Sequence, residues 1–436
     1  MTQTSANYLH PPEVENQQDL GYTPNILDSI RSSLEQYGDI YRVKAPGRNN
    51  YTYVINHPQY VKHVLHTNHR NYLKGMGFDR VELLLGNGLI VSDGEFWKRQ
   101  RQMIQPAFHR KVITGLTELI IESNSALQKQ WQSKLEQGQL INIYQEMSKV
   151  TLHIVLTALF SEDLPSLTNH NGKNPFDILT DETERNLLFA QRFRALGKLM
   201  MEVVHQRRAE NRIPHDFVGM MMSAKDKISG EPMKDKHLLD EIITLIVAGH
   251  ETTASSLSWI WYLLSQNPQA EAKLHQEIEQ QIGGRLPQFS DLEQLKFTQC
   301  VIDEALRLYP PVWLIPRKSK EHDQLGGYHI EAGSDIFISP FFLHRDQRWW
   351  SQPEAFQPLR FQDGEKALPE KYSYIPFSAG PRRCIGDYFS MVEMKLHLAL
   401  LIPLFKLKYH EQQPLELEPH INLRSKNPIM MEVISK

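Results

Sequence analysis

One cysteine stands in a loop whose residue types would hold its sulfur in a fixed direction. Cys384 lies in the segment Phe377–Gly386, which reads Phe-Ser-Ala-Gly-Pro-Arg-Arg-Cys-Ile-Gly. Gly380 and Gly386 allow backbone angles that other residues resist, and Pro381 stiffens the turn. A thiol presented in this way can ligate a metal or attack an electrophile, whereas a lone intracellular cysteine without such a loop is usually a small buried hydrophobe.

The charges beside this cysteine bear on its protonation. Arg382, Arg383 and the start of a predicted helix at Asp387 are expected to lower the pKa of the Cys384 thiol. A covalent nucleophile also needs a positioned base, and the loop offers no histidine or aspartate for that purpose. A covalent nucleophile is therefore disfavoured, and the loop alone leaves a metal ligand and a small buried cysteine about equally open.

A second polar segment interrupts a long apolar pattern. The residues 236–266 predict one helix of roughly 45 Å at 1.5 Å per residue, with little polar face along its first half. In its middle stands Ala-Gly-His-Glu-Thr-Thr at 248–253. Gly249 weakens the helix by about 1 kcal/mol, and the hydroxyls of Thr252 and Thr253 can capture backbone carbonyls. The pattern predicts either a satisfied kink in the core or a groove that admits a small ligand such as O2.

A zinc-protease helix would give His250 and Glu251 another meaning. That motif needs a second histidine four residues after the first, and the position is Ala254. The zinc interpretation fails on its own spacing.

The pattern Phe-x-x-Gly-x-Arg-x-Cys-x-Gly at 377–386 resembles the haem-binding loop of the cytochrome P-450 superfamily, and four further segments resemble the family's motifs in order. They are Trp-x-x-x-Arg at 97–101, Ala-Gly-x-Glu-Thr-Thr at 248–253, Glu-x-x-Arg at 304–307 and the arginine-bearing segment at 356–361. The resemblance runs from about Asp39 to the carboxyl end. It implies a mainly α fold, a triangular helical prism with a small β-rich lobe, that binds haem b.

The resemblance also implies roles for individual residues. Cys384 would be the axial ligand of the haem iron, and Glu251 and Thr252 would deliver protons to bound O2. The other residues expected to contact the haem are Trp97, Arg101, Arg317, His344, Phe377, Arg382 and Gly386. A structural ion network is expected from Glu304, Arg307 and Arg360. The expected substrate-pocket residues are Val247, Ala248, Val312, Trp313, Leu314 and Ile315, although Trp313 fits a core position equally well.

Several other elements are expected to support these residues. Helical spacing at 26–37 ends before Gly38, and a hairpin of 40–43 with 51–55 follows. The longer amphipathic patterns predict helices, and a strand is predicted at 335–338. The helices are expected at Glu95–Ala107, Thr114–Glu136, Ile143–Phe160 and Glu184–Arg208.

Length and composition limit the class of protein. The chain has 436 residues, a formal net charge of −3 and only two cysteines, Cys300 and Cys384. No linker or repeat divides it, so we expect a flexible tail at 1–20 and a single haem domain at 21–436. The near-neutral charge argues against nucleic-acid binding, and the polar start lacks a signal sequence or spanning segment. We expect a soluble, cytoplasmic monomer without a membrane span.

The expected activity is insertion of one oxygen atom from O2 into a small apolar substrate, such as a fatty acid, an alkane or a terpenoid. A larger natural product (a peptide or a polyketide), a peroxide-driven reaction and a non-catalytic haem-thiolate sensor remain alternatives. Electrons from NAD(P)H would arrive through a separate ferredoxin or flavodoxin with its reductase. The basic residues expected to receive that carrier are Lys98, Arg99, Arg110, Lys111 and Arg383.

Overall fold

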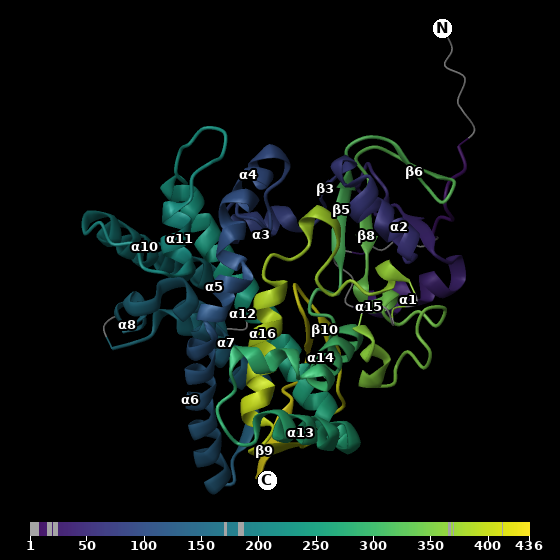
Figure 1. The fold of residues 1–436 in the computed structure, drawn as a ribbon. Coiled ribbons are helices and arrows are strands. Elements are labelled where there is room, and N and C mark those ends of the chain that lie inside the picture. Colours follow the sequence, from purple (N-terminus) through teal and green to yellow (C-terminus); the bar gives the residue numbers. More distant parts are fainter. Residues whose placement is uncertain are drawn as a thin grey trace.

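The computed structural model describes residues 8–14, 20, 25–169, 172–181, 187–364, 368, 370–411 and 413–436. Most of this chain is helical, and a smaller lobe built around a five-stranded sheet stands beside the helices (Figure 1). The predicted mainly α fold with a small β-rich lobe is confirmed.

The helices account for most of the elements. They are α1 (Ile26–Tyr37), α2 (Pro58–Lys62), α3 (Phe78–Leu85), α4 (Gly94–Ile104), α5 (Arg110–Gly115), α6 (Thr117–Glu136), α7 (Ile143–Phe160), α8 (Leu164–Thr168), α9 (Ile178–Asp181), α10 (Leu187–Ala209), α11 (Phe217–Ser223), α12 (Asp235–Gln266), α13 (Pro268–Ile282), α14 (Lys296–Leu308), α15 (Pro340–Leu343) and α16 (Asp387–Leu401). Two shorter helical turns, η1 (His63–Thr67) and η3 (Gln105–Phe108), matter for the site.

The strands in the described part of the chain form four sheets. The largest has the order β1 (Ile40–Val43), β2 (Thr52–Ile55), β8 (Asp335–Ile338), β5 (Ile315–Ser319), β3 (Tyr72–Lys74), and only β2 and β8 pair in parallel. A three-stranded sheet has the order β4 (Leu140–Asn142), β12 (Met430–Ser435), β9 (Phe405–Tyr409). Two hairpins complete the set, β6 (Asp323–Leu325) with β7 (Tyr328–Ile330), and β10 (Leu417–Pro419) with β11 (Leu423–Ser425).

The predicted helices agree with the structure apart from their ends. The pattern at 95–107 is divided into α4 and the tighter turn η3, because Pro106 cannot donate the backbone hydrogen bond that continues an α-helix. The start expected at Glu184 lies outside the described residues. Part of the expected tail lies outside them too, but residues 8–14 pack on the β-rich lobe, where the Val14 amide donates to the Arg42 carbonyl at 3.0 Å.

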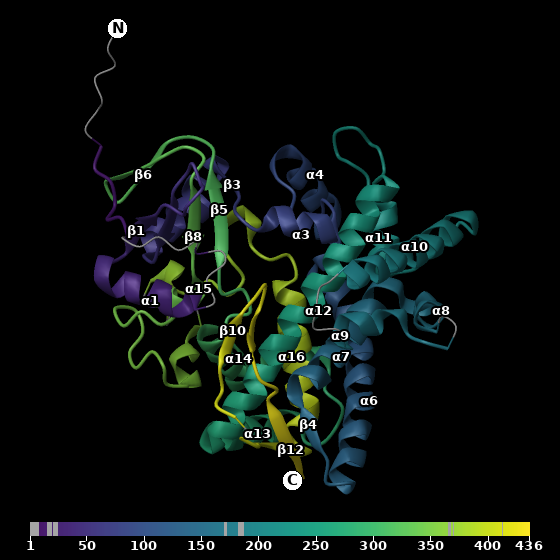
Figure 2. The same cartoon turned by 180° about the vertical axis from the view of Figure 1, so that it is seen from behind.

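The long helix α12 passes between α7 and the final helix α16 in both views (Figures 1 and 2). It contacts α7 closely, and a Cβ on Gly249 would lie 2.9 Å from Cγ2 of Val155. Glycine at this position lets the two helices approach, a role that the sequence could not specify. His250 is buried beside the crossing, with Nε2 2.9 Å from Ser148 Oγ.

One helical stretch of the described chain, Ile143–Thr168, is long and apolar enough to cross a membrane. It contains α7, and 61% of its most apolar 18-residue segment is buried inside the protein. Packing of α7 against α12 and α6 accounts for its apolar composition.

Candidate functional site

The loop that carries Cys384 is fixed by its backbone. The Cys384 amide donates to the Phe377 carbonyl at 2.9 Å, and the loop turns through positive φ angles at Ser378 and Gly380. A Cβ on Gly380 would lie 1.9 Å from the carbonyl oxygen of Leu65 in η1. Only glycine fits there, so the cysteine loop is pressed against the β-rich lobe.

The Cys384 side chain opens into a hollow of about 250 Å³ beside α4. The hollow is lined by Arg101, Gln105, Phe108, His109, Arg383, Cys384, Ile385 and Asp387. A guanidinium and a backbone amide thus stand near the sulfur, and no imidazole or carboxylate is hydrogen-bonded to it among the described residues.

The prediction of a lowered thiol pKa is wrong. The many protein atoms around the sulfur raise the pKa of Cys384, and Asp387 adds to the effect, although the residue is exposed on the side of the hollow. A hydrogen bond from the Gly386 backbone and the charges of Arg101 and Arg383 oppose the shift without reversing it. A metal ion at the sulfur would therefore displace a proton as it binds.

Arg382 is held by three neighbours on the approach to α4. Its guanidinium carbon lies 4.4 Å from the ring centroid of Trp97, and it forms an ion pair with Asp93. Nη1 also donates to the Ser92 carbonyl at 3.0 Å. Trp97 and Arg382, both predicted to contact haem, are thus brought together.

Two further cations, Lys74 and Arg317, lie near Arg382. Lys74 ends β3 and stands directly opposite Arg317 on β5, so both side chains project from the same face of the sheet. Burial and the charges of Arg317 and Arg382 hold the pKa of Lys74 well below its usual value. Burial and Arg382 likewise lower the pKa of Arg317 to about 10. Sequence reasoning missed Lys74 because a three-residue strand carries no motif.

The charge of this cluster suits a ligand with two carboxylates. Lys74, Arg317 and Arg382 share one acidic neighbour, Asp93, which leaves a surplus of two positive charges in a partly buried place. Cations that repel one another destabilise the fold unless anions bind between them. Haem carries two propionates, so the donor set fits the expected cofactor.

The two remaining propionate candidates stand elsewhere. Arg101 lines the hollow beside Cys384. Burial lowers the pKa of Arg101, and the charges of Cys384 and Asp387 oppose that shift. The contact of His344 with the haem stays a prediction. Its Nε2 accepts from the Ile375 amide at 2.8 Å, whereas its buried Nδ1 has no hydrogen-bond partner among the described residues. Burial with nearby Arg307 lowers the pKa of His344 to about 3, so the ring is neutral.

The backbone carbonyl of His344 accepts a hydrogen bond from the buried ion network. Glu304 accepts from Arg307 at 2.7 and 2.8 Å and from Arg360 at 3.0 Å. Arg307 Nη1 also donates to the carbonyls of His344 and Pro353. With Glu304 and Arg307 fully buried, the network joins α14 to the chain before the cysteine loop.

The middle of α12 is more open than its neighbouring turns. Val247, Ala248, Glu251 and Thr252 are half-buried, whereas residues 253–261 are buried. The Thr252 hydroxyl donates to the Ala248 carbonyl at 2.8 Å, as expected for a threonine that captures a backbone carbonyl. Glu251 Oε2 accepts from Asn422 Nδ2 at 3.0 Å, a partner that the sequence did not indicate.

The expected pocket residues of the segment 312–315 divide in two. Val312 is 37% exposed and Leu314 is half-buried, so these can reach a ligand. Trp313 is 5% exposed and donates from Nε1 to the His420 carbonyl, and Ile315 is buried within β5. Trp313 is therefore a core residue that supports the β10–β11 hairpin.

The basic residues expected to receive an electron carrier are mostly paired within the chain. Arg99 lies 3.9 Å from Asp226, Lys98 lies 3.5 Å from Glu95, and Arg383 lies 2.7 Å from Asp387. Arg110 pairs with Glu293. The surface is thus less basic than the sequence predicted, because Asp226 and Glu293 come from distant segments.

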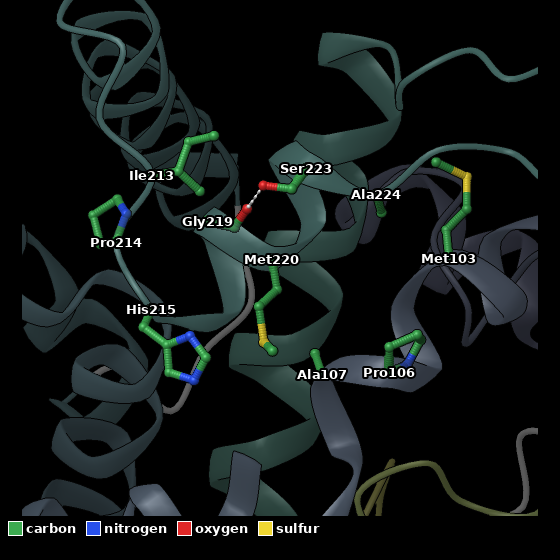
Figure 3. A pocket seen from close by; sticks show the side chains of 10 residues that line it. All are labelled: Met103, Pro106, Ala107, Ile213, Pro214, His215, Gly219, Met220, Ser223 and Ala224. Carbon is green, nitrogen blue, oxygen red and sulfur yellow. Dashed lines mark hydrogen bonds between the residues drawn. The ribbon is translucent and has the colours of Figure 1, made fainter. Parts of the chain in front are cut away.

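A second hollow of about 310 Å³ lies on the other side of η3 (Figure 3). Its walls are largely apolar, with Met103 and Ala107 on one side and Ile213 and Met220 on the other. It contains none of the residues predicted for the site.

Comparison with known proteins agrees with the sequence motifs. The profile of the family described as Cytochrome P450 matches residues 10–433. Cyclooctatin synthase of Streptomyces melanosporofaciens is 32% identical over 92% of this chain and 89% of its own. Cyclooctat-9-en-7-ol 5-monooxygenase of the same organism is 32% identical over 86% and 84%. Carotene epsilon-monooxygenase of Arabidopsis thaliana is 29% identical over 92% and 80%.

Proposed function

The chain belongs to the cytochrome P450 family and is a haem-thiolate monooxygenase, and from that premise we propose that it oxidises a terpenoid hydrocarbon or alcohol. The observation that carries the proposal is the full-length similarity to relatives named for oxidising carotene and cyclooctat-9-en-7-ol. Both names describe molecules that are largely hydrocarbon, and cyclooctat-9-en-7-ol carries one double bond and one hydroxyl. The half-buried Val247 and Ala248 on α12 offer such a substrate an apolar contact.

The bound haem supplies the activation of O2. The chain's own residues hold that group and manage protons around it. Cys384 provides the sulfur ligand from a loop that packs closely against Leu65 at Gly380. Lys74, Arg317 and Arg382 provide cations for the two propionates.

On the oxygen side, Thr252 and Glu251 are the proposed proton-handling pair. The hydroxyl proton of Thr252 is directed to the Ala248 carbonyl, which leaves the hydroxyl oxygen free to accept a further hydrogen bond. Glu251 is half-buried and can exchange a proton with solvent. A peroxide-driven enzyme would not need this pair, so its presence favours O2.

Electrons come from a separate redox protein, as is general in the family. We expect a ferredoxin or flavodoxin with an NAD(P)H-dependent reductase, docked over Arg383 and the neighbouring basic residues. Because Arg383 is paired with Asp387, the carrier's acids must compete with an internal partner. Charge reversal at the exposed Lys111 tests the docking with less disturbance of the fold.

The absorption spectrum of the reduced protein with carbon monoxide tests the haem assignment. Wild type should show the red-shifted Soret band of thiolate ligation, and Cys384→Ala should lose it. The Cys300→Ala variant is the matched control, because Cys300 is buried in α14 away from the loop. An unchanged band in Cys384→Ala would contradict the assignment.

The substrate proposal is tested by spin-state titration followed by turnover. Carotenoid and cyclic terpenoid alcohols should shift the spin state, whereas fatty acids and cyclic peptides should bind less tightly. Product should require O2, NAD(P)H and the redox proteins. Tighter binding of a fatty acid or a peptide would overturn the terpenoid assignment, product with peroxide alone would indicate a peroxygenase, and absence of any product would indicate a sensor.

A further inference from the structure

The second strand of the β10–β11 hairpin is hydrogen-bonded to α12. The Leu423 carbonyl accepts from Ser255 Oγ at 2.8 Å and from Trp259 Nε1 at 3.3 Å. On the other side, the Leu423 amide donates to the Pro311 carbonyl at 2.9 Å. The hairpin is thereby held between α12 and the segment that leads to the candidate substrate residues.

Two side chains at the start of this strand act on Glu251. Asn422 immediately precedes β11, and Arg424 is the second residue of the strand. Asn422 is 6% exposed, and its Nδ2 donates to Glu251 Oε2 at 3.0 Å. The charge of Arg424 also acts on Glu251.

The guanidinium of Arg424 has its own fixed surroundings. It stands opposite Glu418 in the hairpin register and lies 5.6 Å from the ring centroid of Tyr144 at the start of α7. Burial alone would lower the pKa of Arg424, but Tyr144, Glu251 and Glu418 together raise it, so the positive charge persists. Glu418 in turn lies 3.1 Å from Nε2 of His420, whose side chain is 58% exposed. A series of polar side chains, Arg424, Glu418 and His420, thus connects the surroundings of Glu251 to the protein surface.

The contact with Asn422 restricts what Glu251 can do. Residues i and i+1 of a helix do not face each other, so a carboxylate held toward the hairpin does not lie over Thr252. To reach the hydroxyl, Glu251 must leave Asn422 by a side-chain rotation. The hydrogen bond from Asn422, together with the charge of Arg424, therefore affects how often the carboxyl group is available to Thr252.

We propose that the β10–β11 hairpin positions Glu251, with Asn422 as the positioning residue that holds the carboxyl group away from Thr252 between proton transfers. The inference rests on the proposed function, because it assigns a partner to the proton-handling pair. The hairpin also contacts the segment 312–315, because the His420 carbonyl accepts from Trp313 Nε1 at 2.7 Å.

A double-mutant cycle tests the contact without turnover. Glu251→Gln, Asn422→Leu and the double variant are unfolded chemically as haem-loaded proteins. The proposal expects the two substitutions to be coupled, with the product of their separate effects on the unfolding constant differing by more than about threefold from the double variant. Independent effects of the two substitutions would overturn it.

Kinetics test the positioning role. In Asn422→Leu the peroxide released per NAD(P)H and the solvent deuterium isotope effect should change by several fold, while the reduced carbon monoxide spectrum stays that of wild type. Asn422→Asp keeps the shape of the side chain and adds a negative charge beside Glu251. Its pH profile of coupled turnover should shift to higher pH, because the added charge favours the protonated carboxyl.

Lys426→Gln is the matched control. Lys426 lies on the same hairpin, is exposed and pairs with Glu416 rather than with α12. It should leave coupling and the isotope effect unchanged. Equal effects in Lys426→Gln and Asn422→Leu would show a general loss of hairpin stability and overturn the assignment. If no substrate is oxidised, the proposed function fails, yet the unfolding cycle still reports on the contact.

Discussion

The guanidinium of Arg382 lies over the ring of Trp97, 4.4 Å from its centroid, and this contact joins the cysteine loop to α4. A cation over an indole face contributes about 0.5 to 2 kcal/mol, more when water is excluded. The stacking holds the arginine in place, and its nitrogens donate hydrogen bonds to Asp93 and to the Ser92 carbonyl.

Replacing the indole should loosen the haem. In Trp97→Leu we expect haem to dissociate roughly fivefold faster, in line with a loss of about 1 kcal/mol. Transfer of haem to an excess of apomyoglobin measures the rate. Phe96→Leu on the same helix is the control, because Phe96 packs against His237. Equal rates in wild type and Trp97→Leu would argue against the role of the stacked pair.

Lys74 should have opposite effects on the protein with and without haem. In Lys74→Met the repulsion with Arg317 is removed, so the haem-free protein should become more stable by up to about 1 kcal/mol. The haem should bind about tenfold more weakly, because one charge-assisted contact is lost. Unfolding of the haem-free protein and haem titration measure the two effects. Lys318→Met, an exposed residue opposite Leu73, should change neither, and a loss of stability without haem would contradict the prediction.

Gly249→Ala should destabilise the protein although alanine is the better helix former. In an open helix this change gains about 1 kcal/mol, but here the new methyl would lie 2.9 Å from Val155 Cγ2. We expect a net loss of about 1 to 3 kcal/mol, recovered in part by Val155→Ala. Gly197→Ala in α10, where the nearest atom is an ordinary 3.5 Å away, should be neutral or stabilising in the same denaturation assay. An equal gain at both glycines would refute the steric argument.

Glu393 should make the protein less stable as pH rises. It is buried in α16, and burial holds its pKa well above 4.5, so the carboxyl stays protonated in the fold but ionises in the unfolded chain above that pH. Stability from this residue is complete below about pH 4.5 and falls by about 1.4 kcal/mol per pH unit above it, until the folded carboxyl itself ionises.

Denaturation curves of Glu393→Gln against pH test this sign. The stability of the variant relative to wild type should increase as pH rises above about 4.5, until the folded carboxyl itself ionises. Glu432 is an exposed residue in β12, so the stability of Glu432→Gln should depend on pH in the same way as that of wild type. Parallel curves for Glu393→Gln would mean that the carboxyl is not protonated in the fold.

Local sequence predicted the helices well and the side-chain partners less well. The segments of α7 and α12 were placed to within about a residue, because long apolar periodicity fixes a buried helix. The partners of His344 and Lys74 come from Ile375 and Arg317, far away in sequence, so local patterns could not reveal them. Charges at 98, 99 and 110 were visible in the sequence, whereas the acids that pair with two of them were not.

The thiol pKa shows the same limit for electrostatics. The arginines around Cys384 act in the predicted direction, yet their effect is smaller than that of the surrounding protein atoms. Burial depends on packing by α4 and η3, which no pattern in the loop describes. Motif resemblance indicated the cysteine, whereas the direction of its pKa shift depends on tertiary structure.

The parallel pairing of β2 with β8 joins strand Thr52–Ile55 to strand Asp335–Ile338. A ribosome releases the first of these strands long before it has made the second. The outer edge of β2 in the amino-terminal hairpin therefore stays unpaired while most of the helices are synthesised. Such an unpaired edge can pair with strands of other chains. Chains that stop before residue 335 should aggregate rather than accumulate as folded fragments, which makes completion of synthesis a condition for a closed β-rich lobe.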